Sequence, residues 1–422
     1  MSALLEVLDH CARRVPLYRD VAPSAPGEPA SAALALFPVL RRPRLLRAFP
    51  KELVPEGASL SAALASGEIS FVGTSGTGGE RVQVLWSQPW WDTQELDGFA
   101  PHALAWAAVR EPGYREAVLT TPTCTGNLCH VGDLPMTERI DDDRVLFLNQ
   151  KVDPALWSDR DAARMADELD AFQPVGLEAD PAYLAYLAVR WARLGRTPHQ
   201  PRFVELSYEQ PSARHLAAIA RVFPGVPVID AYGSTECGFM LIACEAGRYH
   251  PNPRWHHLEL APLAGGLRPE LARLLITPLG NRWLNLVRYD SGDLVRPQPE
   301  ACPCGRAEPL LVASLEGRAK DAVLHAEGAV LTAREVDAAL APVAGLLHYR
   351  LIQAGPSTFE VDVVPDELDP LDPTEARDRL AALLGAEPRV RVVKSVAVEP
   401  SGKFRLSRAT HVDLDVRLAV AS

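Results

Sequence analysis

Apolar residues occur along this chain in two kinds of pattern that follow one another, and these patterns predict where its helices and strands lie. Apolar positions three to four residues apart predict helices over 1–20, 90–110, 159–171, 181–194 and 214–223. Short, nearly continuous apolar runs predict strands at 117–121, 144–148, 203–206 and 226–230. This order of strands and helices predicts an α/β fold with a largely parallel sheet, in which ligands bind at the carboxyl ends of the strands.

The last hundred residues have a different pattern. It predicts helices over 331–340 and 373–384 and strands over 347–353, 359–364 and 389–398. We therefore predict two domains. A large N-terminal domain of mixed, largely parallel sheets with helices spans 1–317, and a small, mobile α+β C-terminal domain spans 318–422 and is joined to it by a hinge.

Composition narrows the class of protein. The 422 residues are 47% hydrophobic and 23% charged with a net charge of −11, which argues against binding to nucleic acid or to an anionic membrane. The amino-terminal segment lacks the basic and apolar regions of a signal peptide, and we find no membrane-length apolar run. Seven cysteines, an odd number, fit a reducing compartment. We expect a cytoplasmic protein whose partners are small molecules.

A glycine-rich loop follows the strand that ends at Val72. Glycines can turn backbone N–H groups toward an anion, and the hydroxyl groups of the loop add further donors. The sequence therefore predicts a phosphate-binding loop, although a plain glycine-rich hairpin is the alternative. It is not a Walker loop, because no Gly-Lys-Ser/Thr follows. The residues concerned are Thr74, Ser75, Gly76, Thr77, Gly78 and Gly79.

Two further segments place polar residues at predicted strand ends. Tyr232, Thr235 and Glu236 follow the strand at 226–230. An aromatic ring can stack on a base, a hydroxyl can hold a phosphate oxygen and a carboxylate can bind Mg²⁺. Asp293 ends the segment Tyr-Asp-Ser-Gly-Asp, and its carboxylate is suited to accept hydrogen bonds from both hydroxyls of a ribose.

Lysine is scarce, since it occurs only at positions 51, 151, 320, 394 and 403. Lys320 lies in the charged segment Glu-Gly-Arg-Ala-Lys-Asp, whose glycine can serve as a hinge, although a solvated turn residue is the alternative. Lys403 lies in a Ser-Gly-Lys loop. Because the chain uses arginine at most of its basic positions, the presence of lysine at these two positions indicates a specific role for each.

These segments together resemble the successive core motifs of the adenylate-forming enzymes. The short length, Val-Pro-Leu-Tyr-Arg at 15–19 and Cys-Pro-Cys-Gly at 302–305 are most similar to the phenylacetate-CoA ligase group. The motifs that carry the resemblance are Thr-Ser-Gly-Thr-Gly-Gly at 74–79, Tyr-Gly-Ser-Thr-Glu at 232–236, Tyr-Asp-Ser-Gly-Asp at 289–293, Glu-Gly-Arg-Ala-Lys-Asp at 316–321 and Ser-Gly-Lys at 401–403.

The resemblance implies an ATP-dependent, AMP-forming ligase. A carboxylate, in this group a small and often aromatic one, attacks the α-phosphate of ATP, and the acyl-adenylate passes to an acceptor, most simply CoA. The implied roles are β/γ-phosphate binding by 74–79, adenine stacking by Tyr232 beside Gly233, α-phosphate binding by Thr235, Mg²⁺ binding by Glu236, ribose binding by Asp293, ribose or phosphate binding by Arg318, a hinge at Lys320 and neutralisation of carboxylate and α-phosphate by Lys403. Ser207, Tyr208 and Glu209 stand at the adenine-binding position, where the family often has Gly-Ala-Glu, so we expect this segment to contact adenine in a different way.

Several departures from the family pattern leave the substrate open. Glu80 and Arg81 stand where a lysine usually follows the phosphate loop, so Arg81 is a possible substitute. The aryl-pocket segment is not recognisable around 117–137. Adenylation of another oxyanion such as nitrite, amide-bond formation and a non-catalytic nucleotide-binding role are therefore alternatives. The oligomeric state is open, with a homodimer as one option.

A second set of residues has the chemistry of a metal site. Cys302 and Cys304, with Cys244 and His250, offer three thiolates and an imidazole, which suit structural Zn²⁺. The similar group often keeps such a site. His256 or His257 is an alternative fourth ligand, and unligated cysteines near a turn are the simpler interpretation. Cys237 beside Glu236 is expected to be a packing residue.

Overall fold

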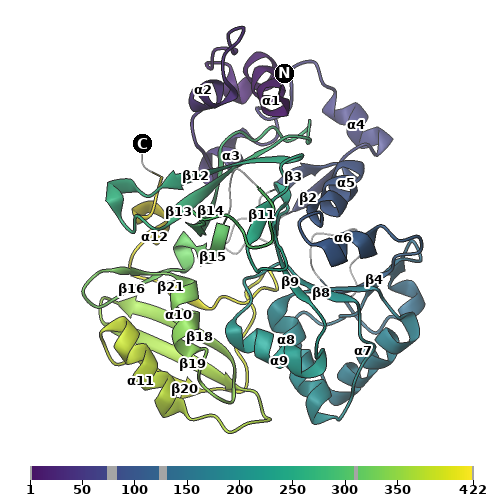
Figure 1. Cartoon of the computed structure of the whole chain (residues 1–422), viewed down its shortest axis with the longest axis vertical. Helices are drawn as coiled ribbons and strands as arrows, with labels where there is room; N and C mark the ends of the chain where they lie inside the picture. The colour runs from purple at the N-terminus through teal and green to yellow at the C-terminus, as the bar shows by residue number, and fades with distance from the viewer. Residues whose placement is uncertain (1, 74–82, 123–130, 308–311, 421–422) are drawn as a thin grey trace. The chain divides into compact units, whose positions relative to one another are not determined.

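The computed structural model describes residues 2–73, 83–122, 131–307 and 312–420 (Figure 1). The chain divides into two compact units, of which unit 1 comprises residues 1–103, 232–314 and 420–422 and unit 2 comprises residues 104–231 and 315–419. Strands β9 (Val228–Ser234) and β15 (Val312–Arg318) each contribute residues to both units. The boundary between the N-terminal domain and the mobile C-terminal domain, which we place at residue 317 from the sequence, stays a prediction.

Unit 1 contains mainly antiparallel strands. In its largest sheet β12 pairs with β13 and β13 with β14, both antiparallel, and the short β1 joins β14 in parallel. β10 and β11 form an antiparallel pair, and so do β2 and β3, which precede and follow residues 74–82 in the sequence. The strands are β1 (Leu40–Arg41), β2 (Ser70–Gly73), β3 (Gln83–Trp86), β10 (Gly238–Ala243), β11 (Tyr249–Pro251), β12 (His256–Pro262), β13 (Ala272–Pro278) and β14 (Tyr289–Pro297).

The helices of unit 1 are short and come early in the chain. α1 starts at an N-cap, because the Ser2 side chain accepts a hydrogen bond from the Leu5 N–H, and it buries Leu4, Leu8 and Cys11. These helices are α1 (Ala3–Arg14), α2 (Ala30–Ala35), α3 (Arg42–Ala48), α4 (Leu60–Ser66) and α5 (Gln88–Gly98).

Unit 2 is built on the predicted parallel sheet. Strands β9, β8, β7, β4 and β6 lie side by side in this order, all parallel, and the short β5 is antiparallel to β6. Because parallel strands end at the same edge, the residues that follow them meet there. The elements are α6 (Ala103–Val109), β4 (Glu116–Leu119), β5 (Ile140–Asp141), β6 (Val145–Phe147), α7 (Asp159–Phe172), β7 (Gly176–Ala179), α8 (Pro181–Arg193), β8 (Phe203–Leu206) and α9 (Ala213–Val222).

Helices α7, α8 and α9 bury the apolar side chains of this sheet. α7 and α9 both begin with a capping box, made by Ser158 with Asp161 and by Ser212 with His215. α8 begins at Asp180, whose carboxylate caps the helix ahead of Pro181. α8 contributes an almost continuous run of buried residues to the core of unit 2.

A four-stranded sheet with flanking helices forms the C-terminal part of unit 2. Its order is β20, β19, β18, β21, in which β18 and β19 are antiparallel and each has a parallel neighbour at the edge. The elements are β16 (Val323–Leu324), β17 (Val330–Leu331), α10 (Ala333–Leu340), β18 (Leu346–Gly355), β19 (Thr358–Pro365), α11 (Pro373–Leu384), β20 (Arg389–Val392), β21 (Ser407–Ala409) and α12 (Leu414–Arg417).

The start of helix α9 forms hydrogen bonds with strand β18 and helix α10 of this C-terminal part. The Arg214 side chain donates to the Leu346 carbonyl at 2.9 Å, and the Ala213 N–H donates to Asp337 at 2.9 Å. The rings of His215 and His348, both buried, approach to 3.0 Å between Nε2 and Nδ1. Since His215 Nδ1 accepts the Ser212 N–H, its Nε2 carries the proton and donates to His348.

The fold class is α/β with a small α+β C-terminal part, as predicted. Several details differ. The strand predicted over 389–398 ends at Val392, and the helix predicted over 1–20 ends at Arg14. The apolar pattern over 90–110 forms two helices, α5 and α6, with a break at 99–102. β9 continues past residue 230 to Ser234, so Tyr232 lies in a strand. β14 begins at Tyr289 and contains Asp293, whereas we expected a strand that ended there.

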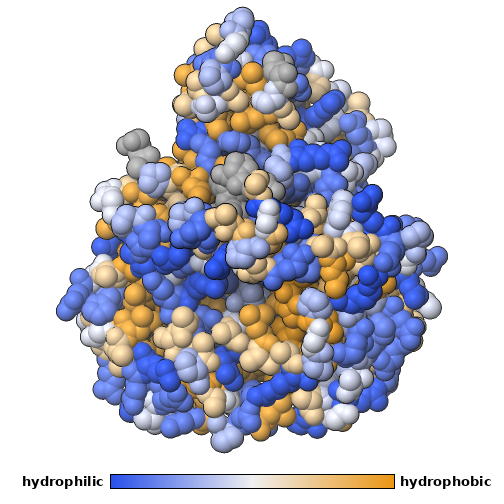
Figure 2. Space-filling model, viewed as in Figure 1, coloured by the Kyte–Doolittle hydropathy of each residue, from blue (hydrophilic) through white to orange (hydrophobic). Residues whose placement is uncertain are grey.

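On the face shown in Figure 2, hydrophilic residues are interspersed with hydrophobic ones. Among the helices of the described ranges, none combines the length and the apolar character that crossing a membrane requires.

Candidate active site

Residues that follow β4, β7 and β8 form a polar edge of unit 2. Thr121 follows β4, Asp180 follows β7, and the predicted adenine-binding segment Ser207–Glu209 follows β8. The Ser207 hydroxyl donates to Glu178 Oε1 at 2.8 Å. Tyr208 has a φ of +69°, in the left-handed region that residues other than glycine seldom occupy. Strain of this kind is concentrated at functional sites.

The Ser-Gly-Lys loop lies against this edge. Lys403 Nζ donates to the Tyr208 carbonyl at 2.7 Å, and the Phe404 N–H donates to Glu209. The Tyr183 hydroxyl donates to the Gly402 carbonyl at 2.8 Å. The structure therefore brings together Lys403 and two of the predicted adenine-binding residues.

Gly402 is required at this contact. Its φ is +78°, and an added Cβ would lie 2.3 Å from the Thr121 hydroxyl oxygen. Both the backbone conformation and the available space therefore exclude a side chain at this position. The glycine of the motif allows the loop to approach the end of β4.

The charged groups around Lys403 perturb one another. Burial raises the pKa of Asp180 to about 7, although the helix N–H groups and Lys403 act in the opposite direction. Burial also raises the pKa of Glu209 well above its usual range, and repulsion from Asp180 adds to this, while Lys403 and Arg318 oppose it. The two acids and two bases thus interact electrostatically within unit 2.

Lys320 lies in a short 3₁₀ turn, Ala319–Asp321. The Arg405 side chain pairs with Asp321 and donates to the Lys320 carbonyl at 3.4 Å, and the Ser407 hydroxyl donates to the Asp321 carbonyl at 2.6 Å. These contacts attach the turn to the segment that follows Lys403. The hinge role of Lys320 remains a prediction.

In unit 1 the structure joins Tyr232 to Asp293. The Tyr232 hydroxyl donates to Asp293 Oδ2 at 2.7 Å and lies 3.3 Å from the Ser291 hydroxyl. Desolvation raises the pKa of Tyr232 well above its usual value, and the Asp293 carboxylate adds to the shift. The phenol therefore stays protonated and can keep donating to the carboxylate.

A buried ion pair fixes the turn that presents Asp293. Arg273 on β13 forms two hydrogen bonds to Asp290 on β14, at 3.0 Å and 2.9 Å, and both side chains are buried. Asp290 also accepts the Gly292 N–H at 3.1 Å, and the Ser291 hydroxyl accepts the Asp293 N–H at 3.2 Å. This network holds the backbone on which Asp293 stands.

The turn between β9 and β10 carries the other predicted residues of unit 1. At Gly233 an added Cβ would lie 3.0 Å from the Gly238 carbonyl oxygen, so the turn is tight. Thr235 is half-buried, and Glu236 is buried with the Tyr289 hydroxyl 3.5 Å from its Oε1. Burial raises the pKa of Cys237 well above its usual value, which agrees with the expected packing role.

Some expectations fall outside the described residues. The phosphate loop at 74–79, with Glu80 and Arg81, lies there, and so does the polar segment at 123–130. Their roles stay predictions. Sequence reasoning also missed three residues of the site, namely Asp180, Tyr183 and Arg273. Asp180 was the easiest of the three to predict from the sequence, because an Asp-Pro pair between a strand and a helix is a common N-cap signal.

The predicted metal ligands lie together in unit 1. Cys244, His250, Cys302 and Cys304 each offer one ligand atom, and all four atoms are within 4.8 Å of one another. The Cys244 and Cys302 sulfurs are 3.6 Å apart, and Cys304 Sγ is 3.4 Å from His250 Nε2. His250 Nδ1 is buried without a hydrogen-bond partner among the described residues. His256 instead approaches the Cys237 carbonyl oxygen at 2.6 Å. Three sulfurs and an imidazole this close together fit tetrahedral Zn²⁺.

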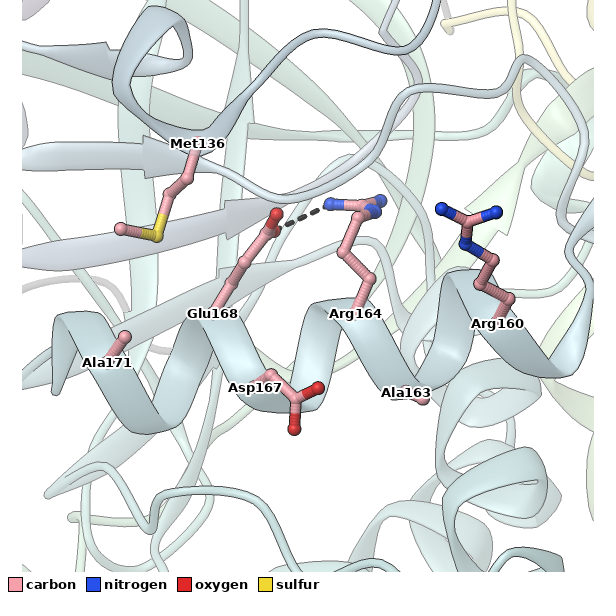
Figure 3. Close-up of a pocket in the computed structure, with 7 residues that line it drawn as sticks. All are labelled: Met136, Arg160, Ala163, Arg164, Asp167, Glu168 and Ala171. Carbon is pink, nitrogen blue, oxygen red and sulfur yellow. Dashed lines mark hydrogen bonds and ion pairs between the residues drawn. The ribbon is translucent and has the colours of Figure 1, made fainter.

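A cavity of about 350 Å³ lies along α7 in unit 2, away from all these residues in sequence (Figure 3). Arg164 Nη1 and Glu168 Oε2 form an ion pair there at 2.6 Å, and Glu168 also pairs with the buried Arg139. None of the residues that line this cavity is one of the predicted site residues, so the cavity explains none of the predicted chemistry. It is lined by Met136, Arg160, Ala163, Arg164, Asp167, Glu168 and Ala171.

Comparison with known proteins gives a result only at the level of structure. No family model matches the chain, and no curated protein matches it by sequence. A solved structure of 2-hydroxyisobutyryl-CoA ligase, in the postadenylation state with R3-HIB-AMP, superimposes with a TM-score of 0.68 and 20% identity over 96% of this chain and 87% of the ligase. This chain has the fold of the adenylate-forming ligases.

Two further structures share the adenylate-forming fold. The anthranilate CoA ligase AuaEII, solved with anthranoyl-AMP, matches with a TM-score of 0.56 and 15% identity over 80% of this chain and 66% of that ligase. The amide bond synthetase McbA from Marinactinospora thermotolerans matches with a TM-score of 0.53 and 16% identity over 83% of this chain and 70% of the synthetase. The similarity to the phenylacetate-CoA ligase group in particular stays a prediction.

Proposed function

We propose that this protein is an AMP-forming ligase that adenylates a small carboxylic acid with ATP and passes the acyl group to an acceptor. The observation that carries the proposal is the position of Lys403, whose ammonium group lies at the carboxyl ends of parallel strands beside Tyr208 and Glu209. This is the edge at which parallel sheets bind ligands. The fold, shared with ligases solved with acyl-adenylates, supports it.

The chain's own side chains have the chemistry that adenylation needs. Lys403 would neutralise the negative charge that builds up where the acid's carboxylate meets the α-phosphate, and Arg318 would bind ribose or phosphate. Asp293 would accept hydrogen bonds from the ribose hydroxyls, with its turn held by Arg273 and Asp290. Thr235 would bind the α-phosphate. Little covalent chemistry is asked of the protein, because position and charge dominate phosphoryl transfer.

Two metal ions belong to the proposal. Glu236 is the carboxylate that would hold Mg²⁺, which screens phosphate charge when bound. Cys244, His250, Cys302 and Cys304 would hold a structural Zn²⁺ that links the end of β10 and β11 to the 302–304 segment. Elemental analysis of protein without an affinity tag should give about one zinc per chain. A folded, metal-free sample would exclude this part of the proposal.

The identities of the acid and of the acceptor are the more specific part of the proposal. We infer a small aromatic acid and CoA as the simplest pair, in line with the resemblance seen in the motifs. Amide-bond formation is the second candidate, because the fold also matches an amide bond synthetase. Nitrite is another oxyanion that the same chemistry could adenylate, and it is the third candidate.

A pyrophosphate-release screen tests the function. Aryl acids, short acids and nitrite are each supplied with ATP and with CoA or a primary amine. Release that depends on one acid, with the acyl product found on CoA or on the amine, identifies both substrates. If ATP binds but no acid, oxyanion or acceptor gives pyrophosphate, the catalytic proposal is wrong, and the non-catalytic nucleotide-binding alternative is favoured.

The mobile C-terminal domain and its hinge have a test of their own. Lys320→Pro should leave acid-dependent pyrophosphate exchange intact and block transfer to the acceptor, because it restricts backbone rotation within the turn. Equal loss of both half-reactions would contradict a hinge at this residue.

A further inference from the structure

Phe404, the residue after Lys403, is buried among aromatic side chains of unit 2. It is 7% exposed, and three rings contact it. Tyr186 on α8 stacks on it, with the ring centroids 5.7 Å apart and the planes inclined at 22°. Tyr183 on the same helix and His348 on β18 form T-shaped pairs with it, at 6.0 Å and 4.7 Å. A ring packed in this way is held in one place, because both arrangements are favourable for aromatic pairs.

The helix that holds this ring also holds the residue before Lys403. The Tyr183 hydroxyl donates to the Gly402 carbonyl at 2.8 Å, and the Tyr183 ring contacts that of Phe404. One side chain of α8 therefore contacts the residues on both sides of Lys403. Between these two contacts, Lys403 Nζ reaches the Tyr208 carbonyl at 2.7 Å.

The contacts of Phe404 are of two kinds. His348 lies on β18, so it belongs, like Phe404, to the segment from 318 onward that the sequence predicts to be a mobile domain. Their contact stays intact if that domain moves as one body. Tyr183 and Tyr186 belong to α8, and their contacts with Phe404 break in such a movement. The ring is therefore the part of the Ser-Gly-Lys loop that docks on α8.

We propose that Phe404 is a positioning residue, whose ring docks on Tyr183 and Tyr186 of α8 and so holds Lys403 at the strand ends. The proposal rests on the proposed function in one respect, since a positioned Lys403 is of use in adenylation. The docking itself is a property of the protein without substrates. Its two consequences, lysine reactivity and adenylation rate, can therefore be measured separately.

Competitive labelling of lysines tests the docking. The five lysines of the chain fall in separate segments, so acetic anhydride modification of each can be measured by peptide mass spectrometry. In the wild-type protein Lys403 should react more slowly than the exposed Lys51 and Lys394. In Phe404→Leu, Lys403 should react several-fold faster relative to those two lysines. Equal relative rates in the two proteins would overturn the proposal, and so would a wild-type Lys403 as reactive as Lys51.

Tyr186 gives the same test from the side of α8, and it serves if Phe404→Leu does not fold. Tyr186→Leu removes the stacked ring and should speed the labelling of Lys403. Tyr186→Phe keeps the ring and removes only a buried hydroxyl that has no hydrogen-bond partner among the described residues, so Lys403 should be labelled as slowly as in the wild type. Equal labelling in Tyr186→Leu and Tyr186→Phe would contradict docking through the ring.

A control variant separates docking from a general loss of packing. Phe223 in the same unit is 1% exposed and forms a T-shaped pair with Trp191 at 6.2 Å. Phe223→Leu is the same change at a buried ring that does not contact the loop through any described ring pair. It should leave the relative labelling of Lys403 unchanged. Faster labelling in this variant, to the extent seen in Phe404→Leu, would show that any packing defect exposes Lys403 and would overturn the proposal.

The two half-reactions give a readout that a purely structural role would not move. With the acid that the pyrophosphate-release screen identifies, Phe404→Leu should lower kcat of pyrophosphate exchange by roughly tenfold, because a misplaced catalytic group affects the chemical step. Transfer from the synthetic acyl-adenylate to the acceptor should change little, because that step does not use Lys403. Equal loss of both half-reactions would contradict positioning. If no acid supports exchange in the wild type but the labelling results hold, the proposed function fails and the docking remains.

Discussion

The two units hold their candidate ATP-binding residues in different ways. In unit 1 the turn carrying Asp293 depends on Arg273 and Asp290, a buried pair with one positive and one negative charge and two direct hydrogen bonds. In unit 2 Lys403 Nζ donates to the Tyr208 carbonyl at 2.7 Å, and the neighbouring Phe404 N–H donates to Glu209. The comparison separates a support made of two buried, oppositely charged side chains from one in which a lysine and the backbone beside it bond to the segment after β8. The first support holds its turn by a charge pair inside one sheet, and the second joins segments that are 195 residues apart in the chain.

The largest expected effect is on stability, and it comes from breaking the buried ion pair between Arg273 and Asp290. Arg273→Met leaves Asp290 buried without its partner, so the free energy of unfolding should fall by about 3–5 kcal/mol in a urea titration. Arg273→Met with Asp290→Leu should recover most of this loss, because it removes both charges. Arg254→Met, which breaks the exposed pair with Asp97, is the control and should cost at most about 1 kcal/mol. A loss no larger than that of the control would show that the pair does not support the turn.

Lys403 gives the next largest effect and acts on rate. Lys403→Ala should lower acid-dependent pyrophosphate exchange roughly 100- to 1,000-fold, the scale seen when a group that stabilises transition-state charge is removed. ATP binding, measured by calorimetry, should persist. Lys394→Ala, at an exposed lysine, should leave the rate unchanged. Full exchange in Lys403→Ala would end the assignment of Lys403 to the chemical step.

Substitution of Asp293, which stands on the turn held by Arg273 and Asp290, should lower the affinity for ATP. Asp293→Asn removes a charged acceptor for the ribose hydroxyls and should weaken ATP binding by about 1.5–3 kcal/mol, with little effect on the unfolding free energy. Tyr232→Phe removes only the hydroxyl that donates to Asp293, so its effect should be smaller, about 1 kcal/mol. Equilibrium titration with ATP checks both. Unchanged affinity in Asp293→Asn would contradict ribose binding.

The smallest effect concerns pH and unit 2. Burial lowers the pKa of His215 to about 3, and burial with repulsion from His215 lowers that of His348. Both rings are therefore neutral when folded, and the stability they contribute is complete above about pH 6.5 and is lost as the pH falls from there toward 3. His215→Asn should reduce this acid-side loss by up to about 1.4 kcal/mol per pH unit. Identical pH profiles in urea unfolding would contradict it.

Raised carboxylate pKa values act in the opposite direction over part of this range. Asp180 binds a proton more tightly in the folded protein, so its contribution to stability falls as the pH rises from about 4 to 7. The difference between wild type and His215→Asn, and not the wild-type profile alone, isolates the histidine. The same comparison with Asp180→Asn isolates the carboxylate.

The sequence predicted much of the fold because its elements have strong local signals. The helices at 159–171, 181–194 and 373–384 and the strand at 203–206 were predicted within about two residues of their observed ends. Caps at Ser158, Asp180 and Asp372 explain the sharp starts. β7 was missed, since Gly-Leu-Glu-Ala has too few apolar residues to register as a buried strand.

The candidate site was predicted less evenly. Motif residues such as Tyr232, Asp293 and Lys403 could be proposed from the sequence because the resemblance marked them, and their roles stay predictions. Residues that support them were not found, because their partners are distant in sequence. Arg273 and Asp290 are 17 residues apart on adjacent strands, and Lys403 and Tyr208 are separated by 195 residues. Register and long-range packing, which local patterns do not encode, decide such pairs.

Because a side chain does not fit at Gly402, a substitution there could separate the two steps of the proposed reaction, which are adenylation of the acid and transfer of the acyl group. Gly402→Val would keep the motif lysine in the chain but prevent its loop from approaching Thr121. Protein of this kind, supplied with synthetic acyl-adenylates, would report acceptor preference without first having to activate any acid. An unknown nucleophile could then be sought with the acid question set aside.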